Sequence, residues 1–300
     1  MRPRAWLAIT LLPLGLTAEA SENGTAAFPN GGEDFLVAAM PPPGFYSMLY
    51  ATRYAADRLA GPAGDVPLDR FDLQVDGVIP RIDWVKPVTW LGADRWGTLL
   101  IVPLLDLDLA TDAGAAHVRA SARGAGDLTL GNGLHWTLGA FETVNGFDVV
   151  APTGSYDANR ALNPGRNQWV FRANHMGTWL TSDWDVSYRF HVEGSAENRA
   201  SHYRSGPAAY LNYAFGWRPA PGTTLGLVGY ELRQFADDKG ALVPEGGNRL
   251  RSRGLGAALK HAVGPGVFVT AKYIRDSDVR NGPRGSTAWL YVSFPLIMPR

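Results

Sequence analysis

Several stretches of the sequence place a polar or ionisable side chain at every second position, between apolar residues. In the segment 184–193, tryptophan, valine, tyrosine and phenylalanine alternate with Asp185, Ser187, Arg189, His191 and Glu193. A period of two puts the polar side chains on one face of a β-strand. Carboxylates, guanidinium groups and an imidazole on one face could form ion pairs or bind a passing solute.

Hydrolytic chemistry is the first alternative to test. His202 and Ser205 lie close together in the sequence, and a hydrolase needs a serine beside a histidine. The sequence has no Gly-x-Ser-x-Gly turn, phosphate-binding loop or His-Glu-x-x-His pair. The six histidines are scattered without metal-ligand spacing, and the lack of cysteine excludes thiolates and disulfides. We therefore predict no catalytic residue, metal or cofactor, and lipid hydrolysis is the least favoured function.

The composition and the first residues narrow the class of protein. The chain has 28 basic and 28 acidic residues, so its formal net charge is zero, which argues against nucleic acid as a partner. Residues 1–20 are typical of a secretory signal peptide, because Arg2 and Arg4 precede an apolar run that ends at Ala18-Glu19-Ala20. No later run approaches the roughly 18 apolar residues of a transmembrane helix. We expect an exported protein in the periplasm, the exterior or the outer membrane.

The rest of the chain is a series of strand-like segments. About twelve segments alternate with period two, and most are longer than the ~5–6 residues of an ordinary strand. Short connections alternate with long ones at 55–69, 109–125, 152–166, 195–204, 236–251 and 277–285. Outer-membrane barrels have an even number of strands, short periplasmic turns and long outer loops. The pattern predicts an all-β fold, a single antiparallel transmembrane barrel over residues 44–300, in preference to a soluble β-sandwich.

Residues 21–43 form an N-terminal segment ahead of the barrel. Within it, residues 33–40 are the best candidate for a short helix, which the prolines at 41–43 would end. Two interpretations of the segment stay open. It plugs the periplasmic mouth with Phe35 and Leu36 inserted, or it is a tether that leads into the first strand.

Polar residues on the expected inner face are candidates for a constriction of the lumen. Opposite charges inside a narrow barrel would pair, so a structural ladder of ion pairs and a constriction that controls passage are compatible interpretations. Around residues 71–84 the assignment assumes that the alternation changes phase at Pro80, as at a β-bulge. The candidates are Asp72, Gln74, Asp76, Arg81, Asp83, Arg172, Asn174, Asp185, Arg189, His191, Glu193, Glu231, Arg233, Lys260 and Lys272.

Polar residues of the expected outer loops are candidates for a vestibule. The alternative is that they are turn residues that hold the loops in shape. These residues are Tyr156, Asp157, Arg166, Asn167, Asp237, Asp238, Lys239, Asn248 and Arg249.

Short motifs along nearly the whole mature chain resemble those of the family called putative MetA-pathway of phenol degradation, or SphA-like. The order and spacing of the motifs carry this resemblance more than any one of them. Among them are Glu33–Leu36, Pro41–Tyr46, Ala151–Asp157, Asn163–Trp169 and Gly247–Arg249. The resemblance implies an outer-membrane β-barrel transporter that admits hydrophobic or aromatic compounds.

From this resemblance we expect passive uptake of small hydrophobic or aromatic molecules into a Gram-negative cell. The expected partners are outer-membrane lipid, the solute and the barrel-assembly machinery. A barrel that transports nothing and serves a structural or adhesive role is the main alternative. The identity of the solute, the resting state of the pore and the oligomeric state stay open.

Overall fold

The computed structural model describes residues 28–240, 243 and 247–297, and the predicted signal peptide lies outside this part of the chain. The described chain is a sheet of 14 strands with one short 3-10 helix, η1 (Trp90–Gly92). The strands are β1 (Gly44–Ala60), β2 (Arg70–Pro87), β3 (Arg95–Ile101), β4 (Leu104–Ala113), β5 (Ala116–Ala125), β6 (Leu128–Leu138), β7 (Phe141–Ala151), β8 (Val170–Leu180), β9 (Trp184–Ser195), β10 (Ala208–Ala220), β11 (Thr223–Gln234), β12 (Arg251–Gly264), β13 (Val267–Arg280) and β14 (Gly282–Ile297).

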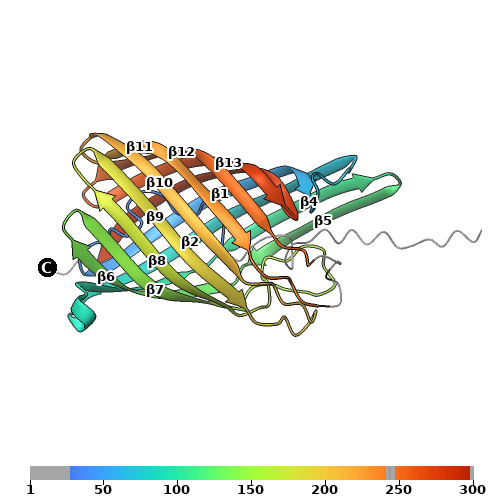
Figure 1. Ribbon diagram of the computed structural model, residues 1–300, viewed down its shortest axis with the longest axis horizontal. Helices are drawn as coiled ribbons and strands as arrows, with labels where there is room; N and C mark the ends of the chain where they lie inside the picture. Colours follow the sequence, from blue (N-terminus) through green and yellow to red (C-terminus); the bar gives the residue numbers. More distant parts are fainter. Residues whose placement is uncertain (1–27, 241–242, 244–246, 298–300) are drawn as a thin grey trace, which may run out of the picture.

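Twelve of these strands form a closed antiparallel ring, which confirms the predicted barrel (Figure 1). The ring closes because β1 pairs with β14 on one side and with β2 on the other. It follows the order of the chain except where β6 lies beside β3. Closure leaves no sheet edge in the ring, as a hydrocarbon environment without hydrogen-bond partners requires.

The two remaining strands, β4 and β5, form a hairpin that projects beyond the ring (Figure 1). Residues Arg81–Pro87 of β2 pair with β3. Residues Arg70–Val78, the outer half of β2, pair with β4. Pro103 stands between β3 and β4 and lacks the N–H that a continuous ladder needs. The predicted long loop at 109–125 is therefore wrong, because β4 turns directly into β5 at Gly114, whose φ of 57° suits a tight turn.

The other connections follow the predicted alternation in part. At the end without the hairpin, Gly139, Gly222 and Gly266 have φ of 66°, 74° and 70° in short turns, where glycine meets no steric penalty. The chain between β7 and β8 and that between β11 and β12 are long loops, as predicted. The predicted loop at 277–285 is wrong, because β13 and β14 continue to a tight turn at Asn281 with φ of 54°.

The N-terminal segment contains no helix where one was predicted. Residues 35–38 form a turn, and Leu36 has a φ of 62°, outside the helical region. The amides of Leu36 and Ala38 donate to Ser187 Oγ and Thr178 Oγ1, each at 3.0 Å. The barrel wall therefore satisfies backbone groups that a helix would have paired internally.

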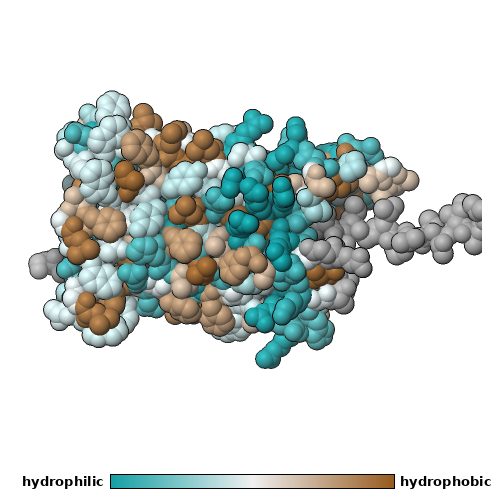
Figure 2. Space-filling model, in the orientation of Figure 1, coloured by the Kyte–Doolittle hydropathy of each residue, from teal (hydrophilic) through white to brown (hydrophobic). Residues whose placement is uncertain are grey.

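The outer surface of the ring is apolar over a broad band (Figure 2). Large apolar side chains are exposed along it, and tryptophans gather near the short turns: Trp84, Trp90, Trp179, Trp184 and Trp217. Tryptophan favours the level of lipid headgroups, where its ring is half solvated. The described residues include no helix long and apolar enough to span a membrane.

Candidate functional site

The N-terminal segment lies inside the barrel, held there by a buried carboxylate. Asp34 forms an ion pair with Lys272 on β13 at 3.0 Å, and its oxygens accept a hydrogen bond from Tyr291 Oη on β14 at 2.7 Å. Lys260 on β12 donates to the backbone carbonyl of Phe35 at 3.5 Å. These contacts join the segment to one side of the barrel through charge.

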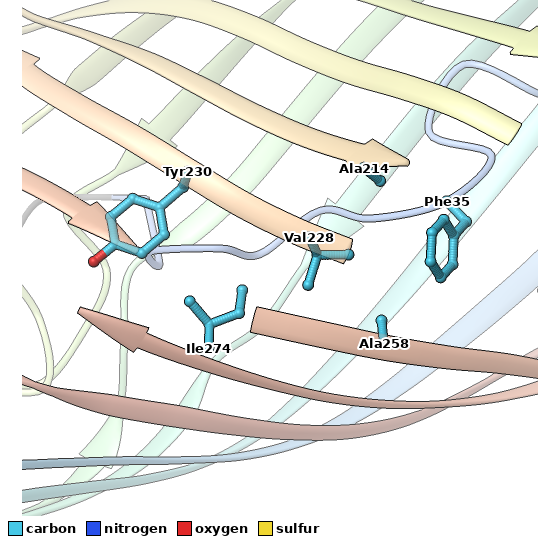
Figure 3. Close-up of a cluster of buried hydrophobic side chains, with 6 residues drawn as sticks. All are labelled: Phe35, Ala214, Val228, Tyr230, Ala258 and Ile274. Atoms are coloured by element: carbon cyan, nitrogen blue, oxygen red, sulfur yellow. The ribbon is translucent and has the colours of Figure 1, made fainter. Parts of the chain in front are cut away.

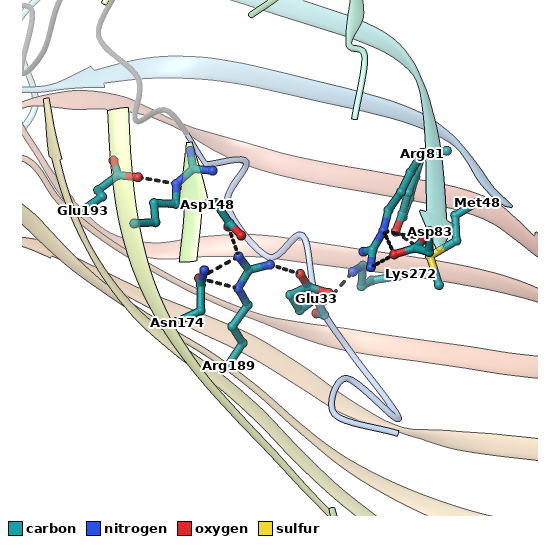
Figure 4. A network of polar contacts seen from close by, with 11 residues as sticks. Glu33, Met48, Arg81, Asp83, Asp148, Asn174, Arg189, Glu193 and Lys272 are labelled. Atoms are coloured by element: carbon teal, nitrogen blue, oxygen red, sulfur yellow. Dashed lines mark hydrogen bonds and ion pairs between the residues drawn. The ribbon is translucent and has the colours of Figure 1, made fainter. Parts of the chain in front are cut away.

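A second anchor is Arg189 on β9, which contacts three acceptors at once (Figure 4). Its guanidinium binds Asp148 on β7 at 2.7 Å, Asn174 on β8 at 2.8 Å and Glu33 of the segment. Its side chain is 5% exposed, so the pairing takes place away from bulk water. A buried charge that lost such partners would be strongly unfavourable. The contact with Arg189 therefore fixes the position of Glu33, and with it that of the N-terminal segment, inside the barrel.

Apolar contacts complete the docking of the segment. Phe35 faces Ala214, Val228 and Ala258 on the inner wall, in a cluster that also contains Tyr230 and Ile274 (Figure 3). Phe35 is 3% exposed. The segment therefore combines a buried aromatic group with paired charges, and it fills part of the lumen along β8 to β14.

Beside the segment lies a cavity of about 330 Å³. Strands β2, β3 and β4 give it an apolar wall of Leu73, Val75, Ile79, Leu99, Ile101, Leu105 and Leu107. Phe28 and Glu33 of the segment border it, and Arg81, Arg172 and Arg189 stand at its polar side. Such a concave, largely apolar space with a few convergent polar groups is typical of a small-molecule site.

Ten of the predicted lumen candidates face inward. They are Arg81, Asp83, Arg172, Asn174, Asp185, Arg189, His191, Glu193, Lys260 and Lys272, which are buried or half-buried. Most are paired with one another or with the segment: Arg81 with Asp83 at 2.7 Å, and Arg172 with Glu193 at 2.8 Å. The arrangement is a set of ion pairs on the inner faces of β2, β8, β9 and β13, and its role in passage stays a proposal.

Five of the predicted lumen candidates do not face the lumen: Asp72, Gln74, Asp76, Glu231 and Arg233. Asp72 and Asp76 lie on the outer face of β2, because the pairing of β1 with β2 runs without a bulge past Pro80. The assumed change of phase was wrong, and Leu73 and Val75 line the cavity instead. Glu231 pairs with Arg253 at 2.7 Å on the outer surface, and Arg233 is exposed. Tyr230 and Leu232 take the inward positions there, with 2% and 0% exposure.

Most of the predicted vestibule residues hold the loops in shape. Asp157 caps the amide of Asn159 at 2.9 Å, Asn167 donates to Asn198 at 2.7 Å, and Arg249 pairs with Asp237. The buried Asp238 accepts from Gly206 N at 2.7 Å. Tyr156 is half-buried, Lys239 is exposed and bridges to Arg204 through its backbone, and Asn248 is buried with φ of 53°. Arg166 also lines the cavity.

Burial raises the pKa of the Asp238 carboxyl above its usual range, although hydrogen bonds from Tyr203, Gly206 and Gln234 oppose the shift. The cause is desolvation, which disfavours the charged form. In the same region, His202 pairs with Glu197 at 2.9 Å, while Ser205 contacts Arg166 at 3.3 Å and Gln168 at 3.5 Å. The two side chains do not form the nucleophile and base of a hydrolase.

Sequence reasoning missed several residues of this site. Phe28, Glu33 and Asp34 were not predicted to contact the barrel wall. The two acids beside Phe35 are a signal for ion pairs with basic residues of the wall. Tyr50 and Tyr291, in contact at 4.8 Å between ring centroids, were assigned to no face. The apolar side of the cavity was missed because an apolar inner face was not expected.

Comparisons with known proteins fit this geometry. A family model described as putative MetA-pathway of phenol degradation matches residues 56–292. An outer membrane channel from Pseudomonas putida F1 is similar with a TM-score of 0.74 and 20% identity, over 86% of this chain and 97% of that one. The translocator domain of the autotransporter NalP from Neisseria meningitidis is similar with a TM-score of 0.52 and 8% identity, over 86% and 91%. No curated protein matches.

These likenesses confirm the predicted fold, and the closed ring with its apolar outer band agrees with the predicted location in the outer membrane. At identities this low, the solved structures establish the architecture alone.

Proposed function

The chain belongs to the family described as putative MetA-pathway of phenol degradation, and on that premise we propose that it is a channel for passive uptake of small hydrophobic or aromatic molecules. One observation carries the proposal: the lumen holds a cavity of about 330 Å³ whose wall on β2 to β4 is apolar. Water-filled porins have polar interiors. An apolar lumen wall instead favours solutes that gain free energy when they leave water.

The geometry suggests a path through the barrel. A solute would enter past Leu162 and Pro164 of the β7–β8 loop and Leu250 at the end of the β11–β12 loop, which border the cavity. It would rest against Leu73, Val75 and Leu105, and would leave past the N-terminal segment or through the wall. No step in this path calls for an energy source, so the flux would follow the concentration gradient.

The N-terminal segment would act as the plug of this path, with Phe35 and Leu36 inserted against the wall. Its charge contacts through Asp34 and Glu33 hold it, and its removal would open the lumen from the cavity to the periplasmic mouth. The same contacts suit a static tether, so the two roles need a functional measurement.

Uptake into liposomes tests both parts of the proposal. The full-length mature protein is refolded into vesicles, and the influx of toluene and of phenol is compared with that into empty vesicles. Influx above the background is expected, with a further increase when residues 28–40 are replaced by a Gly/Ser linker of equal length. A variant with linker residues in the exposed turn at 114–115 serves as the matched control.

No influx from a barrel that shows native heat-modifiable migration would contradict the uptake function and leave a structural or adhesive barrel. Equal influx with and without the linker replacement would contradict the plug.

A further inference from the structure

Phe28 sits in an unusual cage on the lumen wall. Its ring lies edge-on to His191 at 4.8 Å and to Tyr210 at 5.9 Å between centroids. The guanidinium groups of Arg189 and Arg172 lie 4.8 and 5.4 Å from its centre. Two aromatic rings steeply inclined to Phe28 and two cations near its centre form a geometry that recognises an aromatic π-system.

The wall behind Phe28 holds polar atoms that have no hydrogen-bond partner among the described residues. They are Arg172 Nη2, Asn174 Nδ2, both ring nitrogens of His191 and Tyr210 Oη. Asn174, His191 and Tyr210 lie directly opposite one another on β8, β9 and β10. The side chains are at most 6% exposed, so bulk water does not reach these atoms.

Unpaired buried polar atoms are costly and rare, and a cluster of them calls for an explanation. A phenyl ring fills the cage sterically but offers no donor or acceptor. A ring that carried a hydroxyl could accept from Arg172 or Asn174 and donate to His191. The wall is therefore chemically more complementary to a substituted ring than to Phe28.

The cage is also reachable. Phe28, Arg172 and Arg189 all border the cavity of about 330 Å³, whereas His191 and Tyr210 lie behind Phe28. Small-molecule sites begin at roughly 300 Å³. Movement of the Phe28 side chain alone would connect the polar cluster with the cavity.

We propose that Phe28 is an internal stand-in for the solute, and that the wall of Arg172, Asn174, His191 and Tyr210 is a subsite for a single aromatic ring with a hydroxyl substituent. An entering phenol displaces Phe28 and pairs with the unpartnered atoms. This inference rests on the proposed uptake function and goes beyond it, since it distinguishes phenols from aromatic hydrocarbons and names the residues that do so.

Equilibrium binding of phenol and of toluene to the full-length protein in detergent tests the subsite. If Phe28 occupies it about nine-tenths of the time, Phe28→Ala tightens phenol binding about tenfold, because the apparent affinity scales with the free fraction of sites. Toluene binding changes much less, because toluene cannot pair with the polar atoms of the subsite and is expected to rest on the apolar wall of the cavity instead. Phe28→Tyr weakens phenol binding below the wild-type level, because its own hydroxyl takes the positions of the ligand.

Phe171→Ala is the matched control, since Phe171 is the neighbour of Arg172 on β8 but its side chain is 44% exposed on the outer face of the barrel. It should leave phenol binding unchanged. The double variant Phe28→Ala, His191→Phe should lose the preference for phenol over toluene. Phe28→Tyr keeps the ring in place, so it reports on the subsite even where the alanine variant misfolds.

Unchanged phenol affinity in both Phe28 variants, or equal gains for phenol and toluene, would overturn the subsite. The liposome assay separates this failure from that of the proposed function. Binding that follows the expected order without any influx would refute uptake and leave the subsite standing. Influx that is the same in the wild type and in the Phe28 variants would refute the subsite and leave the uptake function standing.

Discussion

The inner walls on two sides of the lumen are built in opposite ways. On β8 and β9 the inward positions are polar, with Arg172, Asn174 and Arg189 buried, and the outward ones are apolar, such as Phe190 at 42% exposure. On the outer half of β2 the inward positions are Leu73 and Val75, and the outward ones are acidic. Strand alternation alone therefore does not identify the side that faces the lumen.

The level of the membrane explains the reversal. The outward face of β2 is apolar at Val78, Ile82 and Trp84, where lipid would contact it, and it becomes charged at Asp76, which pairs with Arg53. Beyond the lipid the outer face is free to be polar, and the inner face is free to be apolar. The polar wall holds the segment by charge, and the apolar wall leaves space for a solute.

The polar wall should be the more sensitive to mutation, and Arg189→Met tests it with the largest expected effect. The substitution leaves Glu33 and Asp148 buried without their cation, which destabilises by roughly 3–5 kcal/mol. Urea unfolding in lipid vesicles, followed by tryptophan fluorescence, measures the change. A loss under 1 kcal/mol would show that water reaches the ion pair.

The apolar wall should respond less, as Leu107→Ala can show. Leu107 packs with Ala56, Leu73, Ala122 and Leu162, and its truncation should cost about 2 kcal/mol, the low end for buried leucine because an existing cavity adjoins it. The same unfolding assay applies. Leu104→Ala is the control, since Leu104 is 49% exposed on the outside and should cost less. Equal losses would contradict the assignment of the two faces.

The outer charged face should contribute less to stability than either inner wall. Arg53→Met breaks the ion pair with Asp76, in which Arg53 is 62% exposed, so the loss should stay below about 1 kcal/mol. Arg53→Met and Arg189→Met make the same substitution, one outside the barrel and one inside, so their losses of stability can be compared directly. A loss as large as that of the buried arginine would place Asp76 in the lumen after all.

The smallest effect is expected in the loops and depends on pH. Because burial raises the pKa of Asp238 above its unfolded value, its contribution to stability is fully present below the unfolded pKa and is lost as the pH rises through the folded pKa. The protection factor of the Gly206 amide, which donates to Asp238, should therefore fall over that window once the exchange rate is corrected for its intrinsic base catalysis. Asp238→Asn should remove the pH dependence, and Asp157→Asn should keep it. A protection factor of the Gly206 amide that does not change with pH in the wild type would contradict the raised pKa of Asp238.

The sequence was sufficient for the architecture because strand length and alternation follow from the spacing of residues such as Trp184 to Glu193. It also identified the ion-pair residues of β8, β9, β12 and β13, where the outward residues are plainly apolar. It failed on β2, β11 and the hairpin, where both faces carry a mixed pattern. In these strands, the face that points to the lumen is determined by cross-strand register and by the position of the bilayer. Neither can be predicted from the sequence of one strand. The partners of Phe28 lie more than 140 residues further along the chain, and the nearby Glu33–Arg189 bond spans 156 residues, so no local pattern could predict either.

The hairpin of β4 and β5 has a consequence for how the barrel sits in its surroundings. β5 pairs with β4 along one edge, and no strand of the described chain pairs with its other edge. Lipid tails cannot solvate that row of amide groups, whereas water can. The hydrocarbon must therefore end at or below the Leu104–Ala125 pair, where the hairpin leaves the ring. The hairpin thereby sets an upper limit on the depth of immersion, while the row of tryptophans at the opposite end anchors the other boundary.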